Sequence, residues 1–326
     1  MKAHTLFGRI VTVSRLAGIA FIVAGFSLYA EEFQVYRGLL HAHTLFSDGS
    51  GTPAEAYAMA KSAGCDFFAV TPHNHKDAEA GAKDRADGIL IATNHLLYES
   101  NDPLSITTTS GAHLQVVSVQ RAAHNATVAN FAPLYGEEFS TISSGNHVNV
   151  LGYDKVLTNP NGDFRSLFQT LDQVVADGKP MPIVQLNHPD VQADLFYGGA
   201  DPKVKKTMFN DYGFDEFGQD FSEIVAAGGK YVVLLELLSG PAMQKQANPN
   251  FRYPDPHEND YYFYLSQGFH ISPSAGQDNH YKTWGLSSSA RMGVLATALT
   301  QNALFEAFRA NRTFVTGLKF SSHPEC

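Results

Sequence analysis

Short apolar runs alternate with amphipathic stretches along the chain after its first thirty residues. Phe33–Leu40 is rich in strand-forming residues and leads directly into a histidine. Thr52–Glu55 is a capping box with proline at the first helical position, and Ala56–Ala63 continue the helix until Gly64 ends it. Asp66–Thr71 is again a short apolar strand. This strand–helix–strand unit predicts a parallel pair of strands.

The same alternation returns in the rest of the chain. Strands are predicted at residues 134–140, 147–153, 182–186, 231–237, 269–274 and 313–316, and helices at 163–176, 258–267 and 301–311. The run 231–237 is almost wholly apolar, as expected of a strand buried on both faces. The least regular stretches, 76–130 and 190–222, are expected to be insertions or lids. Without repeats or linkers, residues 31–326 indicate one barrel-like α/β domain.

The first thirty residues have the pattern of a secretory signal peptide. Lys2, Arg9 and Arg15 precede an apolar run from Leu16 to Leu28, and a small residue, Ala30, stands before two glutamates. The run is shorter than the roughly 20 apolar residues of a membrane span. An uncleaved anchor is the alternative. We expect a cleaved, periplasmic or secreted protein without a membrane segment.

Net charge and cysteine content exclude several classes of function. The formal net charge is −9, and removing the three positive charges of residues 1–30 makes it −12. Nucleic-acid affinity rests on Lys and Arg that neutralise phosphates, so none is expected. The only two cysteines, Cys65 and Cys326, cannot build a disulfide framework or a cysteine zinc site. The 14 histidines are the better candidates for chemistry.

Histidines and carboxylates gather where the predicted strands end. Strand carboxyl ends open onto one face of a parallel barrel, and two histidines at positions i and i+2 of an extended chain point the same way. Imidazole and carboxylate ligands together suit Zn, Mn and Fe(II), and nine are too many for one ion. The candidate ligands of two or three divalent ions are His41, His43, Asp48, His73, Glu138, His147, His188, Asp278 and His280.

The other glutamates and histidines considered are not assigned as metal ligands. Glu138 is preferred to Glu137 because alternation lets only one of the two face the site. Glu236, inside the apolar strand, either orients a ligand or is a structural buried acid. The remaining histidines have no such placement and are interpreted as solvated or packing residues: His75, His95, His113, His124, His257, His270 and His323.

The ordered motifs resemble those of the polymerase and histidinol phosphatase (PHP) family. They are His41-Ala42-His43 with Asp48, Thr71-Pro72-His73-Asn74, Glu138, His147, Asn187-His188-Pro189 and Asp278-Asn279-His280. The resemblance runs from Tyr36 to Thr316. It implies a distorted (β/α)7, TIM-like barrel with two or three metal ions at the strand carboxyl ends, held by the nine residues above. One departure is Pro72, where family members commonly have an acidic residue.

A narrower resemblance, to PHP-type metallohydrolases grouped with carbaryl hydrolase, lies in the last fifty residues. Residues 278–285 and 309–314 carry it. It bears on the substrate, since that group implies a carbamate, amide or carboxylic ester in place of a phosphate ester.

The leading hypothesis is hydrolysis of a phosphate mono- or diester by a hydroxide that bridges the ions. Asp278 and His280 are the candidate catalytic residues, and Lys282, Arg291 and Arg312 are candidate phosphate binders. The alternative is the same site acting on a carbamate, amide or carboxylic ester, with the ions as Lewis acids on a carbonyl. A third reading is a periplasmic metal-binding protein without catalysis.

The signal-peptide hypothesis predicts that the exported protein begins at or near Glu31. Amino-terminal sequencing of the mature protein checks this. A mature protein that still starts at Met1 would contradict it.

Overall fold

The fold is taken from a computed structural model that describes residues 32–74, 102–107, 113–139, 147–160, 163–189, 221–251 and 257–317. The chain divides into two compact units, Met1–Glu32 and Phe33–Cys326, and the second is described below. The predicted signal peptide lies outside the described residues. Among the helices that the structure describes, none is long and apolar enough to cross a membrane.

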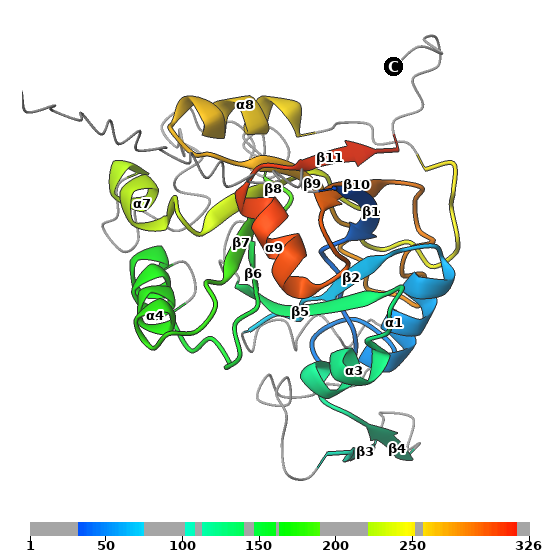
Figure 1. Ribbon diagram of the computed structural model, residues 1–326. Coiled ribbons are helices and arrows are strands. Elements are labelled where there is room, and N and C mark those ends of the chain that lie inside the picture. Colours follow the sequence, from blue (N-terminus) through cyan, green and yellow to red (C-terminus); the bar gives the residue numbers. More distant parts are fainter. Residues whose placement is uncertain are drawn as a thin grey trace, which may run out of the picture. The chain divides into compact units, whose positions relative to one another are not determined.

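One sheet of nine strands forms the centre of this unit, in the order β11–β10–β1–β2–β5–β6–β7–β8–β9 among the described residues (Figure 1). The bounds are β1 Gln34–Leu39, β2 Phe67–Val70, β5 Ala132–Phe139, β6 Val148–Leu151, β7 Ile183–Leu186, β8 Val232–Leu238, β9 Ser272–Ala275, β10 Arg291–Ala296 and β11 Thr313–Thr316. The Leu40 amide donates to the Ala275 carbonyl at 3.3 Å, and the Thr313 hydroxyl donates to the Pro273 carbonyl at 2.7 Å. The sheet therefore closes almost completely into a distorted TIM-like barrel.

Strand direction decides which ends meet. β1, β2 and β5 are parallel to one another, and so are β7, β8 and β9. β6 runs antiparallel to both of its neighbours, and β10 and β11 form an antiparallel extension beside β1. The barrel is thus mixed rather than all-parallel as expected. The amino end of β6 joins the carboxyl ends of the parallel strands, which places the residue before β6 on the same face.

Six helices of the described residues pack outside this sheet. Their bounds are α1 Pro53–Ser62, α3 Val119–Ala126, α4 Phe164–Ala176, α7 Phe221–Gly228, α8 Glu258–Ser266 and α9 Gln301–Arg309. Figure 1 shows α1 and α3 near β2 and β5, and α4 and α7 beside each other on the side of β6 and β7. α4 buries an apolar face that includes Phe164, Leu167, Phe168 and Leu171.

The predicted elements are largely confirmed, with bounds shifted by a few residues. Three elements were not anticipated in the stretch 76–130: the strands β3, Leu104–Thr107, and β4, His113–Val116, which pair as a hairpin, and the helix α3. The strands of this hairpin are only four residues long and half polar, so their pairing has little signature in the sequence. α7 and β10 were also missed. The stretch 190–220 lies outside the described residues.

The turn between β1 and α1 is fixed from both ends. The indole of Trp284, fully buried, donates to the His43 carbonyl at 3.0 Å. Thr52 and Glu55 form the predicted capping box: the Thr52 hydroxyl accepts from the Glu55 amide, and the Glu55 carboxylate accepts from the Thr52 amide at 2.7 Å. These contacts hold the segment that carries Asp48.

Thr52→Ala should lower the free energy of unfolding by about 1 kcal/mol, because the first turn of α1 loses its side-chain cap. Urea unfolding followed by the fluorescence of Trp284, the only tryptophan in the sequence, measures this. Thr52→Ser keeps the oxygen and is the control. Equal stability of the two variants would show that the cap contributes nothing.

Candidate metal centre

All nine predicted ligands lie at the end of the barrel where the parallel strands finish. His41 and His43 follow β1, His73 follows β2, and His188 follows β7. Two isolated bridges prolong the pairing beyond the strands, between Ala42 and Asn279 and between His73 and Glu138. The remaining predicted ligands stand at the same end, in the loop after β1, at the end of β5, before β6 and after β9: Asp48, Glu138, His147, Asp278 and His280.

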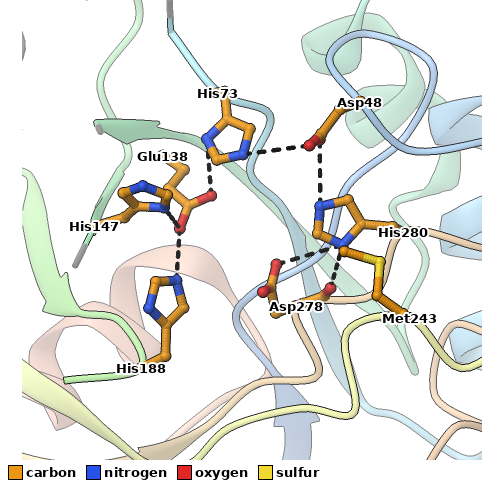
Figure 2. A pocket seen from close by; sticks show the side chains of 8 residues that line it. All are labelled: Asp48, His73, Glu138, His147, His188, Met243, Asp278 and His280. Carbon is orange, nitrogen blue, oxygen red and sulfur yellow. Dashed lines mark hydrogen bonds and ion pairs between the residues drawn. The ribbon is translucent and has the colours of Figure 1, made fainter. Parts of the chain in front are cut away.

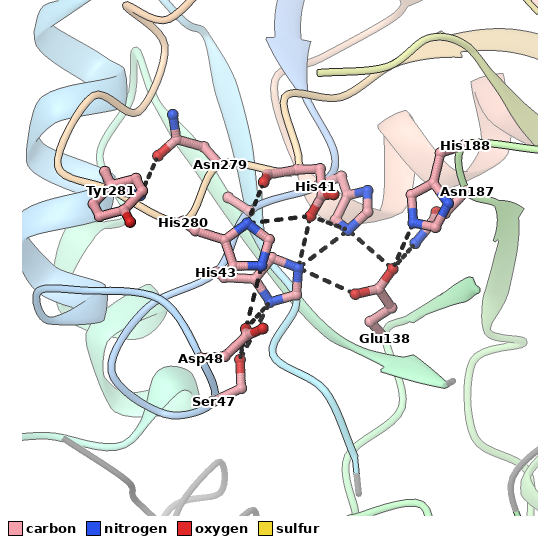
Figure 3. A network of polar contacts seen from close by, with 12 residues as sticks. His41, His43, Ser47, Asp48, Glu138, Asn187, His188, Asn279, His280 and Tyr281 are labelled. Carbon is pink, nitrogen blue, oxygen red and sulfur yellow. Dashed lines mark hydrogen bonds and ion pairs between the residues drawn. The ribbon is translucent and has the colours of Figure 1, made fainter. Parts of the chain in front are cut away.

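The first group of donor atoms belongs to His41, His43, Glu138 and Asp278. The Nε2 atoms of the two histidines are 3.3 Å apart, so they point the same way as expected. His43 Nε2 lies 3.0 Å from Asp278 Oδ1 and 3.1 Å from Glu138 Oε2. His41 Nε2 lies 3.1 Å from Glu138 Oε1 and 3.3 Å from Asp278 Oδ1. Figure 3 shows the side chains of His41, His43 and Glu138 pointing toward one another.

This geometry fits a metal ion better than hydrogen bonds alone. A ring nitrogen carries at most one proton, yet His43 Nε2 has three polar neighbours within 3.3 Å. Ligands that bind one ion at roughly 2.0–2.2 Å lie roughly 3.0–3.5 Å from one another. The observed separations have this size, and nitrogen with carboxylate oxygen is a donor set suited to Zn, Mn or Fe(II).

Two further groups of donors adjoin the first. His43 belongs also to a group with Asp48, His73 and His280, in which Asp48 Oδ1 lies 3.3 Å from His280 Nε2. Glu138 belongs also to a group with His73 and His147, whose Nδ1 atoms lie 3.1 and 3.0 Å from its carboxylate. Because neighbouring groups share His43, His73 and Glu138, the cluster could hold several ions close together.

His188, the ninth predicted ligand, falls in none of these groups. Its Nε2 lies 3.4 Å from Glu138 Oε1, and its ring stacks on that of His41 with centroids 5.7 Å apart. Its backbone has a positive φ of 24°, and Asp278 has one of 46°. Residues other than glycine adopt such angles rarely, and they concentrate where the surrounding structure positions a functional side chain.

Several residues that the sequence analysis left without a role hold the donors in place. The Asn187 amide donates to Glu138 Oε1 at 2.9 Å and accepts from Gln185 at 3.0 Å. The Ser47 hydroxyl lies 3.2 Å from His43 Nδ1, and the Asp278 carbonyl lies 2.7 Å from His280 Nδ1. Asn187 directly precedes the predicted ligand His188, and Gln185 lies three residues before it. This proximity is the only sequence signal that could have found them.

The electrostatics of the cluster favour the binding of cations. Burial opposes charge on Glu138, but the imidazoles around it hold the pKa of its carboxyl well below the ordinary value. Burial lowers the pKa of His43, yet hydrogen bonds with Asp278 and Glu138 outweigh this and raise it to about 10. Burial together with His43 and His147, against the pull of Glu138, lowers the pKa of His73 to about 3. Protons and divalent ions therefore compete for the same nitrogens.

The cluster opens to solvent through a pocket of about 250 Å³. Figure 2 shows seven of the predicted ligands around it, together with the thioether of Met243. His41 and His43 are fully buried behind them. Asp278 is the most accessible carboxylate of the cluster, with a side chain 18% exposed, against 10% for Asp48 and 0% for Glu138.

Comparison with solved structures identifies the architecture, although no family profile and no curated protein matches the sequence. A two-domain protein from Bacteroides vulgatus that contains a predicted PHP-like metal-dependent phosphoesterase matches with a TM-score of 0.50 and 15% identity. The match covers 87% of this chain and 65% of that one, so this chain spans less than two thirds of that protein. The chain has a PHP-like fold. The fold that the sequence motifs implied is confirmed.

Two more distant structures carry no argument of their own. An amidohydrolase from Chromobacterium violaceum has a TM-score of 0.34 and 14% identity, over 77% of this chain and 89% of that one. A lesion-specific endonuclease from Pyrococcus furiosus has a TM-score of 0.37 and 11% identity, over 85% and 56%. The expectation that this chain has no nucleic-acid affinity, which rests on its net charge, stays a prediction.

The three candidate phosphate binders do not line the pocket of this PHP-like barrel. Lys282 pairs with Glu55 at 3.1 Å on the surface, and Arg312 pairs with Glu306. The Arg291 guanidinium donates to backbone carbonyls, those of Ala63, Gly285, Ser288 and Ala290. Their role in phosphate binding stays a prediction, because the sequence shows a basic residue after a ligand but not the carboxylates and carbonyls that it contacts in the structure.

The two adjacent glutamates of β5 provide a test of the cluster in this PHP-like fold. Glu138 joins two donor groups, whereas Glu137 turns away and accepts from the Leu157 amide at 3.0 Å. Burial raises the pKa of Glu137 to about 8, so glutamine replaces a protonated acid of the same shape there.

Glu138→Gln should therefore lower the metal content of the loaded protein by at least one ion, because an amide is a weak ligand and supplies no charge. Glu137→Gln should leave it unchanged. Elemental analysis after metal loading and desalting measures both. Equal metal content in the two variants would show that the cluster is not a metal centre.

Proposed function

We propose that this chain is a metal-dependent hydrolase that cleaves phosphate mono- or diesters. The observation that carries the proposal is the convergence of three donor groups with shared members beside an open pocket. Adjacent ions, when bound there, lower the pKa of water and stabilise the attacking and leaving oxygens of a displacement at phosphorus. The PHP-like fold supports the same reading at the level of architecture alone.

The donor residues have two different roles, metal binding and proton transfer. His41, His43 and Glu138 are buried and hold their positions through other protein groups, so their role is binding. Asp278 differs because its side chain reaches the pocket. Burial opposes its ionisation, but His41, His280 and His43 lower its pKa, so the carboxylate is charged at neutral pH and can accept a proton from water in the pocket.

The contacts of His280 favour a role in metal binding over a role in proton transfer. Its Nδ1 donates to the Asp278 carbonyl, which directs the lone pair of Nε2 toward Asp48. The ring stacks against that of His43, with centroids 4.2 Å apart. We therefore propose Asp278 as the proton acceptor and His280 as a ligand that also fixes the Asp278 backbone.

The described pocket lining contains no serine, cysteine or lysine that could act as a covalent nucleophile. It also contains no arginine or lysine to bind a phosphate. Within the described residues, ions held by the three donor groups would therefore be the charges that balance the negative charge of a phosphate substrate. The lining therefore favours direct attack of water on the phosphoester over a covalent intermediate on a serine, cysteine or lysine.

Asp278→Asn is the sharpest test of this assignment. Asparagine keeps the shape of the side chain but cannot accept the proton, so hydrolysis of nitrophenyl phosphate mono- or diester should fall by roughly 10²-fold or more. The melting temperature should change little. Asp154→Asn, which alters an exposed carboxylate paired with Lys179 outside the cluster, is the control.

An unchanged rate with native metal content would refute the role of Asp278. An aryl carbamate belongs in the same panel, because cleavage of the carbamate and of neither phosphate would replace the phosphoester by a carbonyl substrate. Hydrolysis of none of them by the metal-loaded protein would favour a metal-binding protein without catalysis.

A further inference from the structure

A second acid of the barrel interior, Glu236, lies next to the cluster without belonging to any donor group. It is the only charged residue of β8, whose sequence is otherwise apolar, and its side chain is fully buried. A buried carboxylate that lacked strong partners would destabilise the fold by several kcal/mol. Its contacts therefore show why it is there.

The Glu236 carboxylate holds two of the predicted ligands at once. Oε1 lies 3.2 Å and Oε2 3.3 Å from His41 Nδ1, the ring nitrogen that faces away from the donor group. Oε2 also accepts from the His188 backbone amide at 2.8 Å. That amide belongs to the residue with a φ of 24°. One side chain thus fixes the His41 ring and the unusual backbone turn of His188.

The backbone opposite Glu236 leaves room for this carboxylate and nothing else. A Cβ at Gly276 would lie 1.8 Å from Glu236 Oε1 and 2.6 Å from His41 Cβ. Any side chain there would displace the carboxylate or the ring. Glycine is needed at this position for close approach, not for backbone conformation, because its φ is not in the left-handed region.

A neutral imidazole has one N–H and one lone pair. A carboxylate at Nδ1 can only accept, so it stabilises the tautomer with hydrogen on Nδ1 and leaves the lone pair on Nε2. His41 Nε2 is the atom that faces His43, Glu138 and Asp278. The contact with Glu236 therefore selects the tautomer and the ring orientation that can bind an ion.

We propose that Glu236 is a positioning residue for the metal centre, which sets the tautomer of His41 and the backbone of His188 without touching an ion. The inference rests on the metal-binding part of the proposed function. Partners of this kind at a histidine ligand typically change metal affinity by roughly 10–100-fold.

The test is Co²⁺ binding by the full chain after chelator treatment, because the visible absorption of Co²⁺ reports ligand number and geometry. In Glu236→Gln the amide NH₂ can donate to His41 Nδ1, which favours the tautomer with hydrogen on Nε2. We expect Co²⁺ affinity at one site to fall by roughly 10–100-fold, with a changed absorption band in protein of native circular dichroism.

The matched control is Asp260→Asn, since Asp260 is also a buried carboxylate 3.2 Å from a histidine Nδ1, that of His257, outside the cluster. It should bind Co²⁺ like the parent protein. If Glu236→Gln does not fold, Glu236→Asp takes its place: the charge is kept, but the shorter side chain cannot reach both donors, and the same loss of affinity is expected.

Parental affinity and spectrum in the folded Glu236 variant would overturn the inference, as would an equal loss in Asp260→Asn or a parent protein that binds no Co²⁺. The readout does not depend on hydrolysis. A chain that binds Co²⁺ normally, loses it in Glu236→Gln and cleaves no ester would refute the proposed activity while supporting Glu236.

Discussion

The rest of this site depends on the contacts of one fully buried carboxylate at the end of β5. Glu138 lies within 3.0–3.4 Å of ring nitrogens from five histidines. These are His41, His43, His73, His147 and His188. An ionised carboxylate without water or partners costs several kcal/mol. The barrel has to bring imidazoles, or the ions they bind, to this one point.

The mixed directions of the strands bring these histidines together around Glu138. The parallel strands deliver His41, His73 and His188 at their carboxyl ends, and the reversal of β6 delivers His147 at its amino end. The loop after β9 then closes the cluster through Asp278, whose amide donates to the His41 carbonyl at 3.1 Å. Donors from separate strands are held in place, because each of them lies beside or within a strand whose backbone is fixed by its neighbours.

In the proposed function, metal binding and proton transfer belong to side chains at different depths. His41 and His43 are fully buried behind the pocket. Their Nε2 atoms face the carboxylates of the cluster, and their Nδ1 atoms face Glu236 and the Ser47 hydroxyl. Asp278 and Met243 stand at the pocket, where a substrate can reach them. Acid conditions would protonate the same nitrogens that bind ions, so metal affinity and stability of the centre are linked to pH.

The sequence by itself determined the elements with local signals and the positions of the donors. Capping at Thr52, the β1–α1–β2 alternation and the His41–His43 spacing act over a few residues, so the chain alone specifies them. Only the tertiary structure decided that β6 is reversed and that Arg291 is occupied by carbonyls. It also decided that Glu236 faces His41, 195 residues away in sequence. Such contacts depend on how distant strands meet, and a pattern of neighbouring residues carries no information about the partner that closes them.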